Sequence, residues 1–265
     1  MVKVAAIDLG GVLVKVHHFY MDGCKYVLAY LFNSKAFPAN AYGFRTTPDE
    51  IGNAITMSWE IARLNPRFDS GRYGEHEFVR HMAEIIGYII PDNEVEGICE
   101  SIFYYMLEES ELMPQVKETL KKIEDMGLLP VLASDITNNQ CSQMLVRHGL
   151  ARYDDRSKRG LLHVIYNNSP VSLVSGFLHG IYTSEDWGPK ITGKPFKRIQ
   201  KDFGVNYAEL VLVDNNESNI KRGKALGMHA IKVEHGWPMT ESTVADFKVK
   251  QFREVPSKIE LIRQS

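Results

Sequence analysis

The chain is poor in cysteine and has no long apolar run. Its 265 residues include only three cysteines, Cys24, Cys99 and Cys141, which are far apart and form no CxxC pair. This spacing argues against a structural zinc site and a disulfide framework, and it fits reduced thiols. No apolar run approaches the ~20 residues of a membrane span, and the chain does not start with the charged and then apolar segments of a signal peptide. We therefore expect a cytoplasmic protein without membrane segments.

The chain also lacks a strong excess of either charge. It has 31 Lys and Arg against 33 Asp and Glu, for a formal net charge of −2 and a pI near 6.5. This balance predicts no nucleic-acid partner and no membrane-surface partner. The short basic clusters, 156–159 and 194–201, are interpreted as solvated loop and helix faces. The oligomeric state cannot be read from the sequence.

Four strand-like segments alternate with helical ones. The strand-like segments, rich in β-branched and other apolar residues, are 2–8, 128–135, 209–214 and 228–233. One-face spacing of apolar residues, with glycine or proline at the ends, predicts helices over 114–126, about 137–148, from Pro195 onward and over 217–226. Nearly continuous apolar strands between helices are typical of an α/β fold, with a Rossmann-like parallel sheet covered by helices on both faces.

Two stretches interrupt this alternation. Residues 16–110 carry helical patterns and much of the aromatic content, which predicts an α-helical cap domain inserted after the first strand. Residues 151–190 hold two strand-like runs around the turn signal NNSP, which predicts a hairpin-like insertion. The α/β core is therefore expected to comprise 1–15 and 111–235. The remaining 236–265 should form an extension of one or two helices packing on this core.

Polar residues follow three of the predicted strands. They are Asp8, the pair Ser134–Asp135, and Asp214. Each of them alone is equally well interpreted as a helix cap or turn residue. In open parallel sheets, however, ligands bind outside the carboxyl ends of the strands. One sheet edge should therefore collect all of these groups, which predicts a site there.

Four segments resemble motifs of the haloacid dehalogenase superfamily, mainly its small-molecule phosphatases. VAAIDLGGVLV, residues 4–14, is similar to the nucleophile loop, with Asp8 as the attacking aspartate. Ser134, which ends PVLAS, is similar to the serine whose hydroxyl holds a phosphoryl group. Lys194 in TGKPFKRI is similar to the lysine before proline. VDNNESNIKRGKALG, residues 213–227, resembles the acidic metal-binding motif and its helix.

The resemblance implies a Mg²⁺-dependent phosphatase of a small phosphomonoester, such as a sugar phosphate, with an aspartyl-phosphate intermediate. The inserted helical segment matches the position of the cap in this superfamily. The catalytic residues implied are Asp8, Ser134 and Lys194. The metal ligands implied are Asp8, the carbonyl of Gly10, and Asp214. The substrate-binding residues implied are Gly10, Gly11, Ser134, Asp135 and Lys194. Lys190, four positions before Lys194, is the alternative lysine.

The sequence departs from this pattern near the nucleophile and in the metal motif. Gly10 stands where the phosphatases usually carry a second aspartate, which protonates the leaving group. A good leaving group such as a sugar C1 phosphate would need that acid less, and His17 or His18 are candidate substitutes. Asn215 stands where many members have a second acid, which lowers the charge available for Mg²⁺. Asp135 replaces an asparagine that often follows the motif serine.

Three other functions stay open. A metal-independent dehalogenase shares the carboxylate nucleophile and the lysine, although Asp214 favours the metal-using branch. A catalytically degenerate binding protein would explain Gly10 and Asn215, but a scaffold has no physical need for the acids and the lysine together. The DLGG string also resembles the phosphate loop of sugar kinases, in which a β-meander should follow.

Overall fold

The structure is a computed structural model, and most of the residues that it describes belong to one of the two parts of the chain. The described residues are 1–15, 77, 80, 90–95, 97, 107–108, 110–154, 160–166, 169–234 and 244–264. The chain divides into two compact units, one of Met1–Val16 with Ser110–Ser265 and the other of His17–Glu109. The second unit spans nearly the same residues as the segment 16–110, for which a helical cap stays a prediction. Most of the second unit lies outside the described residues, and so do the candidate acids His17 and His18. Within the part of this unit that is described, residues 92–95 are helical.

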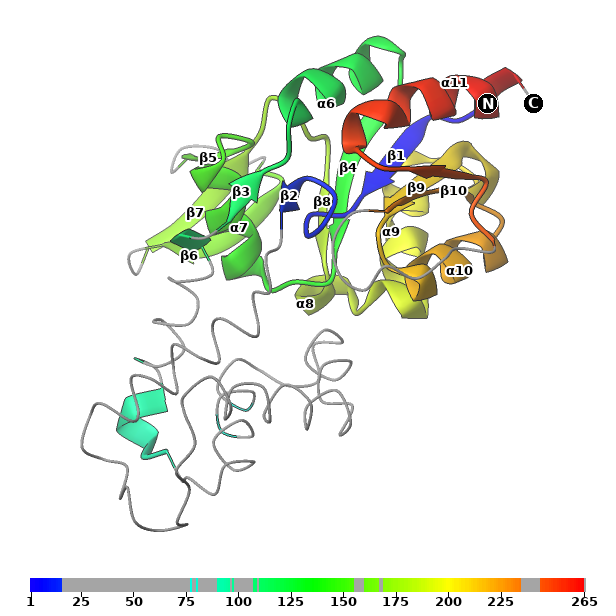
Figure 1. Ribbon diagram of the computed structural model, residues 1–265. Coiled ribbons are helices and arrows are strands. Elements are labelled where there is room, and N and C mark those ends of the chain that lie inside the picture. Colours follow the sequence, from blue (N-terminus) through cyan, green and yellow to red (C-terminus); the bar gives the residue numbers. More distant parts are fainter. Residues whose placement is uncertain are drawn as a thin grey trace, which may run out of the picture. The chain divides into compact units, whose positions relative to one another are not determined.

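A six-stranded, wholly parallel sheet forms the centre of the first unit (Figure 1). Its strand order is β11-β10-β9-β1-β4-β8. The bounds are β1 Val4–Ile7, β4 Leu129–Ser134, β8 Ile181–Thr183, β9 Leu210–Asp214, β10 His229–Val233 and β11 Phe247–Val249. Chain order reverses between β1 and β9, so the sheet has the topological switch point at which doubly wound folds bind ligands.

Helices cover both faces of this sheet, as the sequence predicts. On one face, Val4 and Ala6 of β1 share a buried apolar cluster with Phe196 and Ile199 of α9 (Lys194–Phe203) and Ile220 of α10 (Glu217–Ala225). Alternate residues of a strand point to opposite faces. The other face is covered by α6 (Val116–Asp125) and α11 (Val255–Gln264), which pack against β4 and β10 and against each other (Figure 1). The predicted α/β class is confirmed.

The hairpin-like insertion is a three-stranded antiparallel sheet. Its order is β5-β7-β6, with bounds β5 Arg152–Asp154, β6 Leu162–Tyr166 and β7 Ser169–Val174. The two strand-like runs of the sequence correspond to β6 and β7, and both β5 and β6 contact α7 (Asn138–Arg147). The later part of the segment expected to form the insertion belongs to the main sheet, because it contains β8.

The C-terminal segment contributes a strand as well as a helix. β11 pairs with β10 in parallel, and a 3₁₀ turn, η3 (Phe252–Glu254), leads into α11. The expectation of one or two helices therefore missed the edge strand. β11 has only three residues, and Lys248 in its centre is exposed, so it lacks the apolar run that marks the inner strands.

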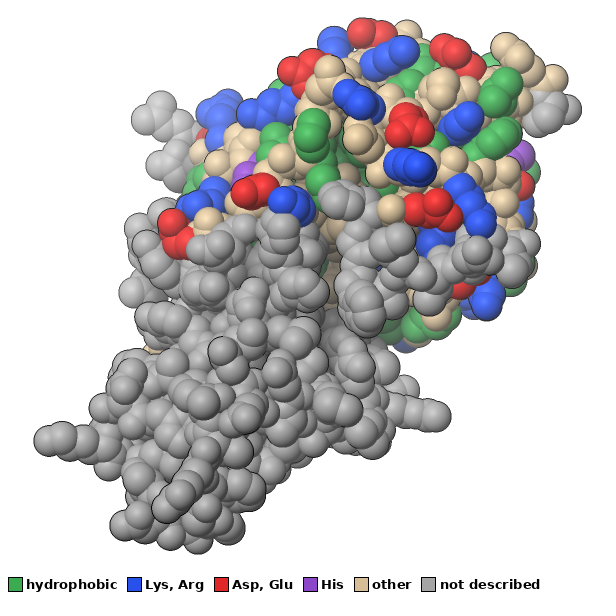
Figure 2. Space-filling view, viewed as in Figure 1, with side chains coloured by type: hydrophobic (Ala, Val, Ile, Leu, Met, Phe, Trp, Pro, Cys, Tyr) green, Lys and Arg blue, Asp and Glu red, His purple; other side chains and the backbone are tan. Residues whose placement is uncertain are grey.

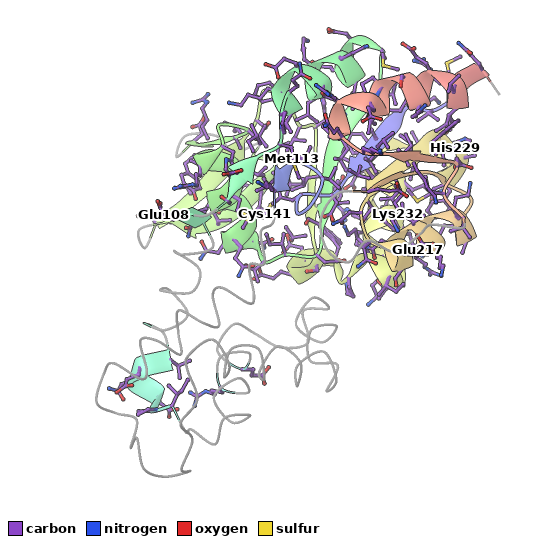
Figure 3. All side chains as sticks on the ribbon, viewed as in Figure 1. Glu108, Met113, Cys141, Glu217, His229 and Lys232 are labelled. Atoms are coloured by element: carbon purple, nitrogen blue, oxygen red, sulfur yellow. The ribbon has the colours of Figure 1, made fainter. Side chains whose placement is uncertain are left out.

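The described surface mixes charges of both signs. Lys and Arg side chains alternate with Asp and Glu over the face seen in Figure 2, in line with the near-balanced composition. Among the described residues, no helix combines the length and the apolar character that crossing a membrane requires. Cys141 in α7 is a free thiol (Figure 3), and its complete burial raises its pKa, so it should be chemically inert.

The packing of α9 against the sheet can be tested with a matched pair of isoleucines. Ile199 is fully buried, whereas Ile191 is 49% exposed. Ile199→Ala removes buried methyl groups and leaves a cavity, so it should lower the free energy of unfolding by about 2–5 kcal/mol. Ile191→Ala should change it by less than about 0.5 kcal/mol. Urea unfolding followed by circular dichroism measures both. Equal losses would contradict this packing.

Candidate active site

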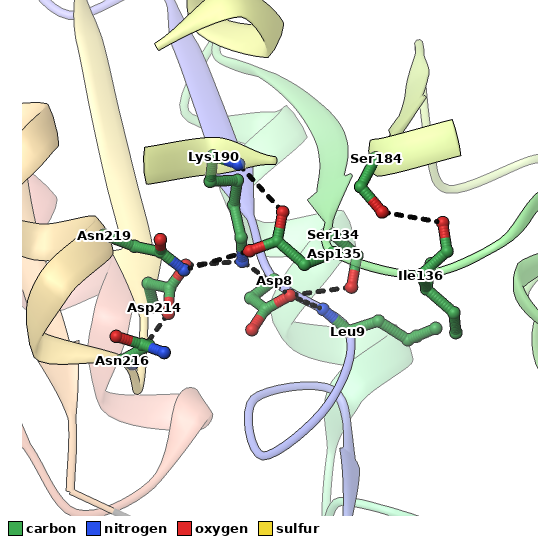
Figure 4. A network of polar contacts seen from close by, with 10 residues as sticks. All are labelled: Asp8, Leu9, Ser134, Asp135, Ile136, Ser184, Lys190, Asp214, Asn216 and Asn219. Atoms are coloured by element: carbon green, nitrogen blue, oxygen red, sulfur yellow. Dashed lines mark hydrogen bonds and ion pairs between the residues drawn. The ribbon is translucent and has the colours of Figure 1, made fainter. Parts of the chain in front are cut away.

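Three neighbouring strands present polar side chains at one edge of the sheet. Asp8 follows β1 and its N–H donates to the carbonyl of Val213 in β9, 3.0 Å away. Asp214 ends β9, and Ser134 ends β4 on the other side of β1. The strands are parallel and in register, so their carboxyl ends lie together at the switch point. The predicted convergence of Asp8, Ser134 and Asp214 is what the structure shows (Figure 4).

One oxygen of the Asp8 carboxylate is held by three donors. Oδ1 accepts hydrogen bonds from the N–H of Leu9 at 2.8 Å and the hydroxyl of Ser134 at 2.8 Å, and it pairs with the Lys190 ammonium at 2.8 Å. Within the described part of the chain, Oδ2 accepts no hydrogen bond. Asp8 is only 7% exposed. The three donors on Oδ1 fix the orientation of this nearly buried carboxylate and leave Oδ2 available.

The Lys190 ammonium joins the two strand-end carboxylates. Its Nζ lies 2.8 Å from Asp8 Oδ1 and 2.6 Å from Asp214 Oδ2. Lys190 is 1% exposed and Asp214 is fully buried. The remaining oxygen of Asp214, Oδ1, accepts from the N–H of Asn216 at 2.7 Å, and the Asn219 amide donates to Oδ2 at 3.2 Å. A buried lysine is tolerated here because two carboxylates compensate its charge.

The cluster carries more negative than positive charge. Asp8, Asp135 and Asp214 surround one ammonium, so two negative charges stay uncompensated when all groups are ionised. Burial, followed by the repulsion of Asp8, raises the pKa of Asp214 to about 7, although Lys190 opposes this shift. Burial also raises the pKa of Asp135. Burial alone would lower the pKa of Lys190, but attraction by the carboxylates outweighs it and raises that pKa.

The loop after Asp8 turns tightly around one carbonyl. The oxygen of Leu9 accepts hydrogen bonds from the N–H groups of Leu13 and Val14, both at 2.9 Å. Gly11 has φ of +75°, a conformation that a residue with a Cβ adopts only with strain, so glycine is required there. Val14–Lys15, the strand β2, then pairs with β3 (Glu111–Leu112). The loop thereby leaves the sheet edge directly beside Asp8.

Asp135 points toward the other site residues. Its Oδ1 accepts from the backbone N–H of Lys190 at 2.8 Å, and its Oδ2 accepts from the Asn219 amide at 3.5 Å. The alternative interpretation as a cap of the next helix does not apply, because the N-cap of α7 is Thr137, whose hydroxyl accepts from Gln140. Asp135 therefore connects the tip of β4 with the lysine and with α10.

The structure places Lys190 in the site, and Lys194 outside it. Lys194 is the first residue of α9 and is exposed, whereas Lys190 opens the 3₁₀ turn η1 (Lys190–Thr192) at the sheet edge. The motif match to lysine before proline favoured Lys194. However, Pro195 marks the first turn of a helix, where a side chain is free to face solvent. The alternative lysine is the one whose ammonium reaches Asp8. The Gly188–Pro189 pair before it is a turn signal that could have indicated this.

A Mg²⁺ ion fits the chemistry of this donor set. Asp8 and Asp214 each keep one carboxylate oxygen outside the contact with Lys190, and the backbone of Gly10 offers a carbonyl in the adjoining loop. Mg²⁺ prefers such oxygen ligands, and its double charge equals the uncompensated charge of the cluster. Among the described residues, no group of three or more His, Cys, Asp and Glu side chains is arranged as a metal site. A bound ion would thus depend on the two carboxylates together with backbone oxygen and water.

Comparisons with known proteins find similarity in structure. No protein-family profile and no curated protein sequence matches the chain. The L-2-haloacid dehalogenase of Xanthobacter autotrophicus with covalently bound chloropropionic acid superposes with a TM-score of 0.61 at 13% identity, covering 98% of this chain and 99% of the other. A HAD phosphatase from Thermococcus onnurineus gives 0.61 at 14% identity, covering 97% of both chains. A predicted phosphoglycolate phosphatase from Haemophilus somnus 129pt gives 0.59 at 14% identity, covering 98% of both.

The role of the buried ion pairs can be tested by comparing the two lysines. Lys190→Met leaves two carboxylates in a buried site without their cation, so it should lower the free energy of unfolding at pH 7 by about 3–5 kcal/mol. Lys194→Met removes an exposed side chain and should change it by less than about 0.5 kcal/mol. Chemical denaturation measures both variants. A larger loss for Lys194→Met would contradict the placement of the site lysine.

Proposed function

The chain has the haloacid dehalogenase-like fold, and on this premise we propose that it is a hydrolase with Asp8 as its nucleophile. The substrate class that the site supports best is a small phosphomonoester. The observation that carries the proposal is the environment of Asp8, in which three donors hold one oxygen and leave the other available. A scaffold without catalytic function would have no need to bury a carboxylate in this way, because burial of charge is unfavourable.

The reaction follows from the two oxygens of Asp8. Oδ2 attacks the phosphorus atom, the bond between phosphorus and the ester oxygen breaks, and the released alkoxide takes a proton from water. Water then attacks the phosphorus of the resulting aspartyl phosphate, the bond to Asp8 breaks, and inorganic phosphate leaves. Splitting the hydrolysis into two displacements replaces one difficult step by two easier ones.

Lys190 and Ser134 assist this chemistry from opposite sides of Asp8. The Lys190 ammonium pairs with the nucleophile and reduces its repulsion from a phosphate anion. The Ser134 hydroxyl, which donates to Asp8 at 2.8 Å, is within reach of a phosphoryl oxygen placed beside that carboxylate. Loop N–H groups at Gly10 and Gly11 would bind the remaining phosphoryl oxygens, since glycine permits a close backbone approach.

Mg²⁺ is the proposed cofactor, held by Asp8, Asp214 and the carbonyl of Gly10. When bound there, it would offset the negative charge that the carboxylates and the phosphate bring together. Lys190 cannot provide this compensation alone, because its single charge already serves both Asp8 and Asp214.

Gly10 limits which phosphomonoesters the site can hydrolyse quickly. It has no side chain to protonate the leaving group, and a missing general acid typically lowers the rate by ~10²–10⁴ for a poor leaving group. A phosphate whose leaving group is already stable, such as a sugar C1 phosphate, suits this site best. We therefore expect hydrolysis rates to depend strongly on the pKa of the leaving group.

A metal-independent dehalogenase is the second candidate. The same Asp8 oxygen could attack carbon and displace a halide, after which water would hydrolyse the resulting ester and restore the carboxylate. Departure of a halide needs no proton, so the lack of an acid at Gly10 would not matter. The direct contact of Lys190 with Asp214 supports this reading, because the lysine then stabilises both carboxylates without a metal. One structural neighbour is a dehalogenase with chloropropionic acid covalently bound. Activity on haloacids that survives a chelator would favour this candidate.

The nucleophile is tested by replacing Asp8. Asp8→Asn should abolish turnover in a screen of phosphomonoesters with Mg²⁺, because the neutral amide cannot form the acyl phosphate. Asp125→Asn is the matched control: this exposed acid on α6 pairs with Lys121 and should keep full activity. Release of inorganic phosphate measures all three proteins. Undiminished turnover by Asp8→Asn would rule out the mechanism, and no turnover by the wild type on any substrate would favour a binding protein.

Metal binding can be tested without any substrate. Mg²⁺ at about 100 times its dissociation constant should stabilise the wild type by about 2.7 kcal/mol. Asp214→Asn should lose this stabilisation because one carboxylate ligand is gone, whereas Asp125→Asn should retain it. Thermal unfolding with Mg²⁺ and with EDTA provides the comparison. An equal shift for Asp214→Asn would place the ion elsewhere.

A further inference from the structure

The lysine of the site stands on a short turn rather than on a helix or strand. Lys190 opens η1, which has only three residues and follows Pro189. Two backbone hydrogen bonds close the turn, from the Thr192 N–H to the Pro189 carbonyl and from the Gly193 N–H to the Lys190 carbonyl, both at 2.9 Å. They fix the shape of the turn and not its position relative to Asp8. The position of the ammonium beside Asp8 therefore depends on what holds the turn from outside.

Asp135 holds the first residue of this turn. Its Oδ1 accepts a hydrogen bond from the backbone N–H of Lys190 at 2.8 Å, and this bond to a charged acceptor is stronger than a neutral one. Asp135 directly follows Ser134 at the end of β4. The contact thus fastens the lysine turn to the same strand end that supplies the serine (Figure 4).

The second oxygen of Asp135 extends this connection, through Asn219 of α10, to Asp214 at the end of β9. The Asn219 amide donates to Asp135 Oδ2 at 3.5 Å and to Asp214 Oδ2 at 3.2 Å. A carboxylate can accept from both Lys190 and Asn219, whereas an asparagine at this position has only one acceptor oxygen. This difference gives a physical reason for aspartate in a cluster that already has an excess of negative charge.

The far end of the turn is fixed as well. The Arg222 guanidinium, from α10, donates to the carbonyl of Thr192 at 2.9 Å. Gly193 ends the turn with φ of +77°, and a Cβ there would lie 3.0 Å from two atoms of Arg222. Because this end of the turn is fixed, the contact with Asp135 determines the backbone position from which the Lys190 side chain extends toward Asp8.

We propose that Asp135 is a positioning residue that fixes the Lys190 turn, and that it does not bind the substrate. This inference rests on the proposed hydrolase function for its catalytic consequence, and on the geometry alone for its structural one. Its effect reaches the reaction through the ammonium, because a misplacement of about 1 Å at a catalytic group can lower the rate ~10²-fold.

The kinetic test compares Asp135→Ala and Asp135→Asn with Asp125→Ala as the control. Asp135→Ala should lower kcat about 10- to 100-fold with KM changed less than about twofold, since the lysine and not the substrate loses its support. Asp135→Asn keeps an acceptor for the Lys190 N–H and should restore most of that loss. A rise in KM at constant kcat would show substrate binding instead. If Asp135→Asn lowers kcat as much as Asp135→Ala does, the charge of Asp135 matters and its hydrogen bond to the turn does not, which would contradict the proposal.

A second measurement does not require activity. Hydrogen exchange of the Lys190 amide, followed by NMR, should be slow in the wild type and in Asp135→Asn and fast in Asp135→Ala. Equal protection in all three would overturn the proposal. A wild type that hydrolyses nothing would refute the proposed function alone, because the exchange of this amide would still decide whether Asp135 holds the turn.

Discussion

The contact of one buried ammonium with two strand-end carboxylates is the interaction on which this structure depends. Asp8 and Asp214 lie on neighbouring strands, and their like charges would repel each other strongly in a buried site. Lys190 lies within 2.8 Å of both carboxylates and makes their proximity tolerable. The same contact leaves one oxygen of each acid outside it. Attack by the free oxygen of Asp8, and coordination of a cation with the free oxygen of Asp214, are therefore compatible with the fold.

The topology of the sheet explains why these groups meet. β1 is flanked by β9 on one side and β4 on the other, both parallel to it, so three strand ends deliver Asp8, Asp214 and Ser134 to one place. A β1 flanked in this way is not the first strand of a β-meander, which argues against the sugar-kinase alternative. Different sequences build such a sheet, which is consistent with strong structural similarity at 13% identity.

The sequence was sufficient to predict the strands that carry the site, because strands buried on both faces are almost continuously apolar. β1, β4, β9 and β10 all show that pattern, and the residue after such a strand must lie at the sheet edge. The short β8 and β11 could not be found in this way: each has three residues, and their place in the sheet comes from pairing with distant segments.

The lysine and Asp135 show where local patterns are insufficient. Pro195 correctly indicated the start of α9, but a helix start says nothing about which nearby lysine reaches Asp8. That depends on the turn before the helix and on the contacts that fix it. Asp135 was expected to bind substrate because it follows the motif serine, yet its two oxygens face Lys190 and Asn219. Such contacts join segments far apart in the sequence, and only the folded chain reveals them.

The proposed function depends on the covalent phosphorylation of Asp8 during turnover. Rapid acid quenching of the reaction, reduction with borohydride and peptide mass spectrometry test it most directly, because an acyl phosphate is reduced to an alcohol. Homoserine should replace Asp8 in the peptide that contains residues 4–14, and only when substrate was present. Turnover that leaves this aspartate unmodified, or modifies a different residue, would contradict it.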